Sequence, residues 1–188
     1  MSNATAIKMN GFISRYGIAA KNAAAGSNIF PETILTAAAL ESGYGESALS
    51  AKYNNFFGIK ADSSWKGKYI LYSTKEEDSS GKTYTVNAKF RVYDSAQESF
   101  SNYVKFVSGP RYIKAGVTVA TTPIEQFAKL KAAGYATSSK YVEMLTSIYK
   151  SVSSWVVTNS VATGSIGTIA FAGLIFFLIT NKKRKKAK

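Results

Sequence analysis

The stretch that most strongly predicts the fold is ILTAAALESGYG, residues 34–45. Pro31 is well placed to open a helix here, because proline is favoured in the first helical turn. Ile34 and Glu41 then lie seven residues apart, nearly superposed on one face, and the glycines that end the stretch follow Glu41 closely. A carboxyl group on the apolar stripe of a helix is poorly solvated, which raises its pKa. A general acid needs such a pKa near neutral pH, so Glu41 is the first candidate catalytic residue.

The composition removes most other catalytic strategies. The chain of 188 residues contains no histidine and no cysteine. Ser-His-Asp and Cys-His catalysis, thiol redox chemistry, disulfides and the usual zinc sites are therefore excluded. A mechanism based on carboxylates is the most natural hydrolytic strategy left, and we expect it to need no cofactor and no metal ion.

The positive charge is unevenly distributed along the chain. The net charge is +13, and six of the 24 basic residues lie in the last seven positions. The rest of the chain therefore carries +7, spread over a domain rather than massed in one run. Such a surface suits nucleic acid, an anionic membrane or an anionic polymer such as a bacterial wall, and charge alone does not choose between them.

A long uncharged stretch follows the basic domain. No charged residue occurs between Ser151 and Asn181. Roughly 20 largely apolar residues suffice to cross a bilayer as a helix, so we expect a transmembrane helix at 156–180, after a short linker at 151–155. Trp155 and the basic tail at 181–188 are typical of interfacial anchors. Small residues recur at every fourth position and would allow an oligomer. The alternative is a buried core helix of the preceding domain.

Residues 1–150 are expected to form one α+β domain. Residues 83–92 alternate between apolar and polar side chains, which predicts a strand with one buried face. The pattern of helices, a β hairpin and further helices predicts a helical body with a small β lobe. The predicted helices are 7–25, 31–48, one from 95 onward, 122–134 and 139–150, and the predicted strands are 68–74 and 83–92, joined by a polar turn at 76–82.

Five short segments stand out along this domain. They are ALESGYG at 39–45, NNFFGIK at 54–60, TKE at 74–76, FRVY at 90–93 and YAT at 135–137. Their order is similar to that in bacterial glucosaminidase domains, glycoside hydrolase family 73, over about residues 12–149. The resemblance implies a lysozyme-like helical body with a small β lobe, to which the sequence adds one C-terminal transmembrane helix. It also implies cleavage of the β-1,4 bond after N-acetylglucosamine in peptidoglycan glycan strands.

The resemblance further implies roles for single residues. Glu41 resembles the general acid of the family, Glu76 its second carboxylate and Tyr135 its cleft tyrosine. Tyr44 stands where a tryptophan is common and keeps an aromatic surface for a sugar. The resemblance departs at positions 138–139, where this chain has Ser-Ser and the family usually has Asp-Pro. The positioning of that loop is therefore open.

The residues themselves leave the second carboxylate and the asparagines less well determined. Glu77 and Asp78 adjoin Glu76, so any of the three is a candidate. The separation of two catalytic carboxylates would predict the stereochemical outcome, and the N-acetyl group of the substrate could assist instead. Asn54 and Asn55 are expected to fix a turn that lines the cleft, and both are candidate substrate-binding residues.

These features predict a membrane-anchored peptidoglycan hydrolase. Residues 1–12 show no secretion signal, and an anchored domain without one suits a bacteriophage particle that encloses a membrane. The basic tail would then contact nucleic acid or anionic lipid without sequence preference. A wall-remodelling hydrolase of the bacterial cell envelope is the alternative setting. A lytic transglycosylase and a catalytically inactive wall-binding protein are the alternative activities.

Overall fold

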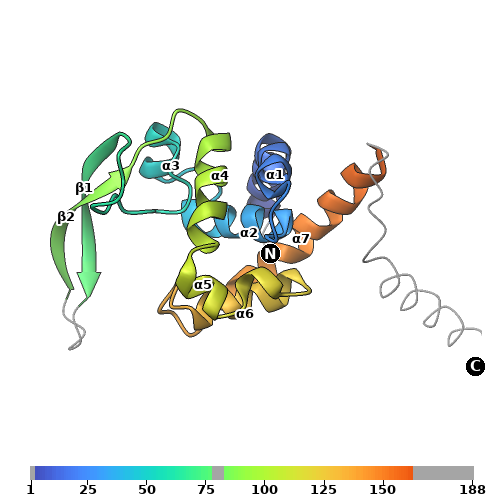
Figure 1. Ribbon diagram of the computed structural model, residues 1–188. Helices are drawn as coiled ribbons and strands as arrows, with labels where there is room; N and C mark the ends of the chain where they lie inside the picture. Colours follow the sequence, from blue (N-terminus) through green and yellow to red (C-terminus); the bar gives the residue numbers. More distant parts are fainter. Residues whose placement is uncertain (1–2, 78–82, 163–188) are drawn as a thin grey trace, which may run out of the picture. The chain divides into compact units, whose positions relative to one another are not determined.

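The computed structural model describes residues 3–77 and 83–162 (Figure 1). The chain divides into two compact units, Met1–Val156 and Val157–Lys188, and the fold described here is that of the first. Its elements, in chain order, are α1 (Asn3–Ala24), α2 (Pro31–Ser42), α3 (Ala48–Tyr53), β1 (Tyr69–Glu77), β2 (Thr83–Arg91), α4 (Ala96–Val107), α5 (Pro110–Lys114), the 3-10 helix η1 (Val117–Val119), α6 (Pro123–Ala132) and the start of α7 (Tyr141–Ala162).

Helix α2 is the buried centre of the helical body. All seven residues from 33 to 39 are fully buried. Burial of a large aliphatic side chain, such as Ile34 or Leu35, contributes roughly 1.5–3 kcal/mol. Because small residues fill the remaining positions of this run, neighbouring helices approach α2 closely on several sides.

The predicted helix over 31–48 is wrong in its C-terminal part. Helix α2 ends at Ser42, where Gly43 adopts the left-handed conformation (φ 56°) and its amide bonds back to the last turn. Tyr44 continues in the same region with φ 62°, so the chain reverses before α3 begins. Glu41 therefore stands in the last turn of α2.

An aromatic core joins α1, α4 and the loop after α3. The rings of Tyr16 and Phe56 lie 4.7 Å apart, and those of Phe56 and Phe100 lie 5.3 Å apart with nearly perpendicular planes. Edge-to-face packing of this kind is favourable beyond its buried area. Figure 1 shows α1 and α4 side by side over α2, with the hairpin beyond α3 and α4.

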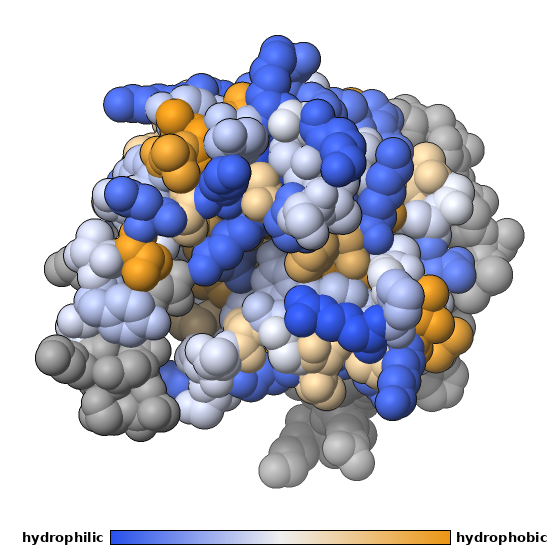
Figure 2. All heavy atoms as spheres, turned by 60° about the vertical axis from the view of Figure 1, so that its left-hand side comes forward, coloured by the Kyte–Doolittle hydropathy of each residue, from blue (hydrophilic) through white to orange (hydrophobic). Residues whose placement is uncertain are grey.

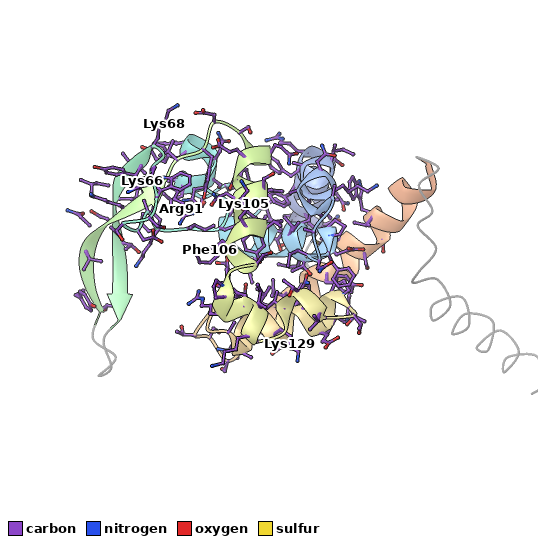
Figure 3. The ribbon with its side chains drawn as sticks, viewed as in Figure 1. Lys66, Lys68, Arg91, Lys105, Phe106 and Lys129 are labelled. Carbon is purple, nitrogen blue, oxygen red and sulfur yellow. The ribbon has the colours of Figure 1, made fainter. Side chains whose placement is uncertain are left out.

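The two predicted strands form one antiparallel hairpin, as expected. Its register pairs Tyr69 with Arg91 at the base and Glu76 with Tyr84 near the tip. Arg91 anchors the base: it is 8% exposed, donates to the carbonyl of Lys60 and to Asn102, and stacks 4.5 Å from the centre of the Trp65 ring. Figure 3 shows Arg91 between the strands and α4.

The last predicted helix, 139–150, corresponds to α7, which begins at Tyr141 and continues beyond residue 150. Residues 151–155, predicted as a linker, are helical and belong to α7. Within residues 3–77 and 83–162, no helix combines the length and the apolar character that crossing a membrane requires. The predicted spanning segment 156–180 lies mostly outside the described residues, and the basic tail at 181–188 lies entirely outside them.

Candidate active site

Glu41 is an open position on an otherwise buried helix. Glu41 is exposed to solvent, while residues 33–39 of the same helix are fully buried. Protein atoms nevertheless crowd the carboxyl on its other sides, and this desolvation raises the pKa of Glu41, as predicted. A carboxyl group that is reachable from solvent but poorly hydrated suits a proton donor in the wall of a cleft.

Three tyrosines, Tyr103, Tyr135 and Tyr141, lie near this carboxyl, and a fourth, Tyr112, packs against Tyr135; we call the four the tyrosine cluster. The ring centre of Tyr135 lies 5.9 Å from that of Tyr103, 6.4 Å from that of Tyr112 and 5.9 Å from that of Tyr141. Burial raises the pKa of Tyr103, Tyr135 and Tyr141, and the negative charge of Glu41 raises each of them further. These three tyrosines are therefore neutral at physiological pH, and their O–H groups can donate near Glu41.

The hydroxyl of Tyr141 has the most direct relation to Glu41. It lies close to the Glu41 carboxyl and lowers its pKa, opposing the larger effect of desolvation. Its geometry nevertheless falls short of a full hydrogen bond. The hydroxyls of Tyr103 and Tyr135 are also buried and bond to no group in the part of the chain that the structure describes. These O–H groups are donors available beside the Glu41 carboxyl.

Tyr135 is brought to Glu41 as the sequence predicted, whereas Tyr103 and Tyr141 were missed. Tyr112 is 2% exposed and belongs to the core. The density of tyrosines gave no signal for the cluster, because positions 69–93 also hold four tyrosines in a shorter stretch. Helical periodicity assigns such residues to the core, so the pattern by itself does not show that their hydroxyls converge.

A lysine fixes the loop that carries Tyr135. The Lys131 ammonium donates to the carbonyl oxygens of Ala136 and Thr137, at 2.9 and 2.6 Å. The amide of Tyr135 bonds to the carbonyl of Leu130 at 3.1 Å, which closes the end of α6. The loop is therefore held from α6 in this chain, where the sequence left its positioning open.

The hairpin register separates the candidate second carboxylates. Alternate residues of a strand lie on opposite faces, so Glu76 shares a face with Tyr72 and, across the pair, with Phe90. Phe90, on this face, is 5% exposed, and Arg91, on the opposite face, is 8% exposed and bonds to Asn102 of α4, so both faces are covered at the base of the hairpin. Asp78 lies outside the described residues. The register therefore does not choose between Glu76 and Glu77, and both stand on the hairpin while Glu41 stands on α2.

The predicted substrate-binding asparagines hold the turn after α3. Asn55 is 1% exposed, and its amide group donates to the carbonyls of Ile59 and Arg91 and accepts from the amide of Ile59. Both N–H groups are thus used and no surface is left for a sugar, so direct contact by Asn55 is not supported. Asn54 caps α3 with φ 52° and donates to the carbonyl of Tyr93. Its role as a turn residue accords with the sequence.

Tyr44 follows the end of α2, three residues after Glu41. It is half-buried, and its ring packs edge-on against Phe12 with 6.4 Å between centres. Contact of Tyr44 with a sugar stays a prediction.

Seen from the hairpin side, hydrophilic side chains dominate the surface, which is hollowed near its middle (Figure 2). In the described ranges, no group of three or more acidic side chains is arranged to hold a metal ion.

A model of one protein family matches residues 17–154: Glucosaminidase, mannosyl-glycoprotein endo-beta-N-acetylglucosaminidase. The chain belongs to this family. The catalytic domain of the autolysin Auto from Listeria monocytogenes has a similar structure, with a TM-score of 0.69 and 31% identity over 78% of this chain and 85% of that chain. This similarity confirms the predicted fold of the domain, a mostly helical, lysozyme-like body with a small two-stranded sheet.

Two curated relatives of the family differ in the activity that their names give. Peptidoglycan hydrolase FlgJ of Salmonella typhimurium is 39% identical over 142 residues, which are 73% of this chain and 44% of that protein. A probable N-acetylmuramidase of Lactococcus lactis is 36% identical over 137 residues, 69% of this chain and 30% of that protein. The chain thus spans less than half the length of these relatives.

Proposed function

We propose that this domain hydrolyses the β-1,4 bond after N-acetylglucosamine in peptidoglycan glycan strands, with Glu41 as the general acid. The single observation that carries the proposal is the raised pKa of a solvent-accessible carboxyl in the last turn of a buried helix, beside the tyrosine cluster. Membership of the glucosaminidase family supplies the substrate class.

The first step of the reaction follows from the state of Glu41. Its protonated carboxyl donates to the glycosidic oxygen as the bond to the anomeric carbon breaks, and positive charge develops on the sugar ring. Because desolvation disfavours the carboxylate, a larger fraction of Glu41 carries its proton near neutral pH than in a solvated glutamate. The O–H groups of the tyrosine cluster are neutral donors that can orient the sugar without removing this proton.

A second group must stabilise the positive charge and direct water. We propose Glu76 for this role, because it matches the second carboxylate that the family resemblance implies and stands on the hairpin. The hairpin is anchored at Arg91 and carries Glu76 near its other end. Participation of the substrate N-acetyl group is the alternative, since it would need no second carboxylate.

The bond that is cleaved can be established by analysis of the products. Wild-type protein and Glu41→Gln would be incubated with purified peptidoglycan, and the new ends reduced and identified by mass spectrometry. Reduced N-acetylglucosamine ends are expected for the wild type and none for the variant. Reduced N-acetylmuramic acid ends would instead support the activity named for the Lactococcus lactis relative. Anhydro-muramic ends would show a lytic transglycosylase.

We further propose that the chain is attached to a membrane through residues 156–180. The proposal is supported by the absence of charged residues between Ser151 and Asn181 and by the basic run that follows. The full chain should sediment with membranes and resist extraction by high salt, and a chain ending at residue 155 should not. A bacteriophage membrane and a cell envelope are distinguished by assaying the protein in purified particles and in uninfected cells.

A further inference from the structure

Arg111 is an exposed cation held flat against aromatic rings beside the active site. It lies in the first turn of α5, directly before the buried Tyr112. Its guanidinium lies 4.5 Å from the centre of the Tyr112 ring and 5.7 Å from that of Phe106, and it donates a short hydrogen bond to the Tyr112 hydroxyl. Stacking and this hydrogen bond fix the plane of the guanidinium, although the side chain is open to solvent.

The same guanidinium reaches the tyrosine cluster around Glu41. Tyr112 belongs to that cluster, and both Tyr112 and Phe106 lie 6.4 Å, between ring centres, from Tyr135. The negative charge of Glu41 in turn raises the pKa of Tyr135. Arg111 is thus separated from the Glu41 carboxyl by two layers of aromatic rings, Tyr112 with Phe106 and then Tyr135. That separation suits contact with a substituent of the substrate, rather than with the bond that breaks.

The charge of Arg111 is not compensated within the domain as described. No carboxylate in residues 3–77 and 83–162 lies within ion-pair distance of it. The sequence between Glu98 and Glu125 contains Lys105, Arg111 and Lys114 and no acidic residue. Figure 3 shows Lys105 and Phe106 in the last turns of α4, above α5. A guanidinium held against aromatic rings, with no ion-pair partner among the described residues, is suited to an anionic ligand.

We infer that Arg111 binds a carboxylate of the substrate, carried by the muramic acid side of the glycan. This inference rests on the proposed function, because muramic acid brings the carboxylates. Its lactyl ether ends in a carboxylate where the stem peptide has been removed, and the stem peptide itself bears carboxylates where it is present. The planar fork of arginine donates two parallel N–H···O bonds to a carboxylate, whereas lysine offers only a point charge.

The alternative is that Arg111 only braces Tyr112. The two roles differ in how they depend on the substrate. A brace supports the active site for every substrate, so its loss lowers the activity on all of them equally. A carboxylate-binding residue matters only when the substrate carries a free carboxylate. The test therefore compares one variant on two forms of one substrate.

The experiment measures kcat/KM on soluble peptidoglycan fragments with free carboxylates and on the same fragments after conversion of the carboxylates to methylamides. On free carboxylates, Arg111→Gln is expected to be about tenfold slower than the wild type, mainly through KM. On the methylamidated fragments, kcat/KM of Arg111→Gln should lie within about twofold of the wild-type value. Arg111→Lys should recover part of the loss. Lys114→Gln, on the same helix, is the matched control and should follow the wild type.

A third substrate, glycan strands without peptides, identifies the carboxylate. If the loss in Arg111→Gln persists there, the lactyl carboxylate is the ligand, and if it disappears, the ligand is on the stem peptide. An equal loss on free and methylamidated fragments would overturn the inference in favour of a brace. Indifference of the wild type to methylamidation would overturn it as well. A wild type that cleaves none of the three substrates would instead refute the proposed function.

Discussion

Lys131 and Thr137 are joined by a hydrogen bond of 2.6 Å from the lysine ammonium to the threonine carbonyl. A second bond of 2.9 Å reaches the carbonyl of Ala136. Together they tie the loop after Tyr135 to α6, six residues or fewer upstream in the sequence. Because backbone carbonyls accept both bonds, any sequence in this loop could be held in the same way. The loop therefore does not depend on the Asp-Pro pair usual in the family.

Lys131→Gln should misplace Tyr135 while leaving the protein folded. Hydrogen bonds to a charged donor typically contribute about 1.5–3 kcal/mol, and partial exposure of Lys131 brings the expected loss of unfolding free energy to about 1 kcal/mol. We expect kcat to fall roughly tenfold, since displacement near the chemistry is costly. Lys129→Gln on the same helix is the control. Unchanged kcat in Lys131→Gln, together with lowered stability, would show that the loop geometry does not matter for the reaction.

Glu41→Gln should be slightly more stable than the wild type at neutral pH. The folded-state pKa of Glu41 is raised, so the folded protein binds its proton more readily than the unfolded chain does. The resulting penalty is absent below the unfolded value of 4.5 and develops as the pH rises through the folded pKa. Because the side chain is exposed and screened, the gain is on the order of 0.5 kcal/mol. Denaturant unfolding at pH 4 and pH 7 measures it; a loss of stability at pH 7 would contradict the assignment.

Tyr141→Phe should move the basic limb of the pH–rate profile to higher pH. The Tyr141 hydroxyl lowers the pKa of Glu41, so removing it leaves desolvation unopposed and raises that pKa further. A general acid works only while protonated, and kcat/KM therefore falls at a higher pH in the variant. Tyr103→Phe is the control, since Tyr103 is buried as deeply but does not lower the pKa of Glu41. A limb that moves equally in both variants would exclude a specific effect of Tyr141.

Glu76→Gln and Glu77→Gln should differ although the residues are neighbours. Neighbouring residues of a strand point to opposite faces, so at most one of the two can face the helical body, and the family resemblance favours Glu76. We expect kcat of Glu76→Gln to fall at least ~100-fold and that of Glu77→Gln to stay within about twofold of the wild type. Turnover of soluble glycan fragments gives both values. The reverse order would show that the strand register places Glu77 in the cleft, and activity in both would favour assistance by the substrate N-acetyl group.

Asn55→Ala should destabilise the protein without a specific effect on KM. The substitution orphans two carbonyls and one amide in a buried turn, and each lost partner costs about 1–3 kcal/mol. Chemical denaturation should therefore show a loss of about 3 kcal/mol or more. Asn54→Gly, at the neighbouring left-handed position, should lose much less, because glycine accepts that conformation. Normal stability of Asn55→Ala with a raised KM would restore its predicted contact with substrate.

Local patterns in the sequence were sufficient for much of the helical body and for the acid. The alternation over 83–92 predicted β2 almost to the residue, and Pro31 predicted the start of α2. The raised pKa of Glu41 followed from its place on an apolar helix face, which is a property of spacing alone. The end of α2 was predicted less well, because the prediction continued the helix past Gly43 and Tyr44, whose left-handed backbone ends it.

Contacts between distant segments could not be predicted in the same way. Asn55 was expected to meet the substrate, yet its amide bonds to Arg91, 36 residues away. Tyr141 was not singled out from the sequence, and its relation to Glu41, 100 residues earlier, depends on how α7 packs beside α2. Spacing within one element reports only which residues share a face of it.

The sequence by itself determined the chemical type of the site and one of its members. Without histidine or cysteine a carboxyl group was the most natural catalyst, and the position of Glu41 in an apolar helix made it a poorly hydrated one. Only the tertiary structure decided what lies near that carboxyl: three tyrosines from two helices and a loop, with Tyr112 and the guanidinium of Arg111 beyond them. The physical reason is that desolvation along a helix follows from local spacing, whereas the direction of a hydroxyl toward a distant carboxyl is fixed only when the helices pack.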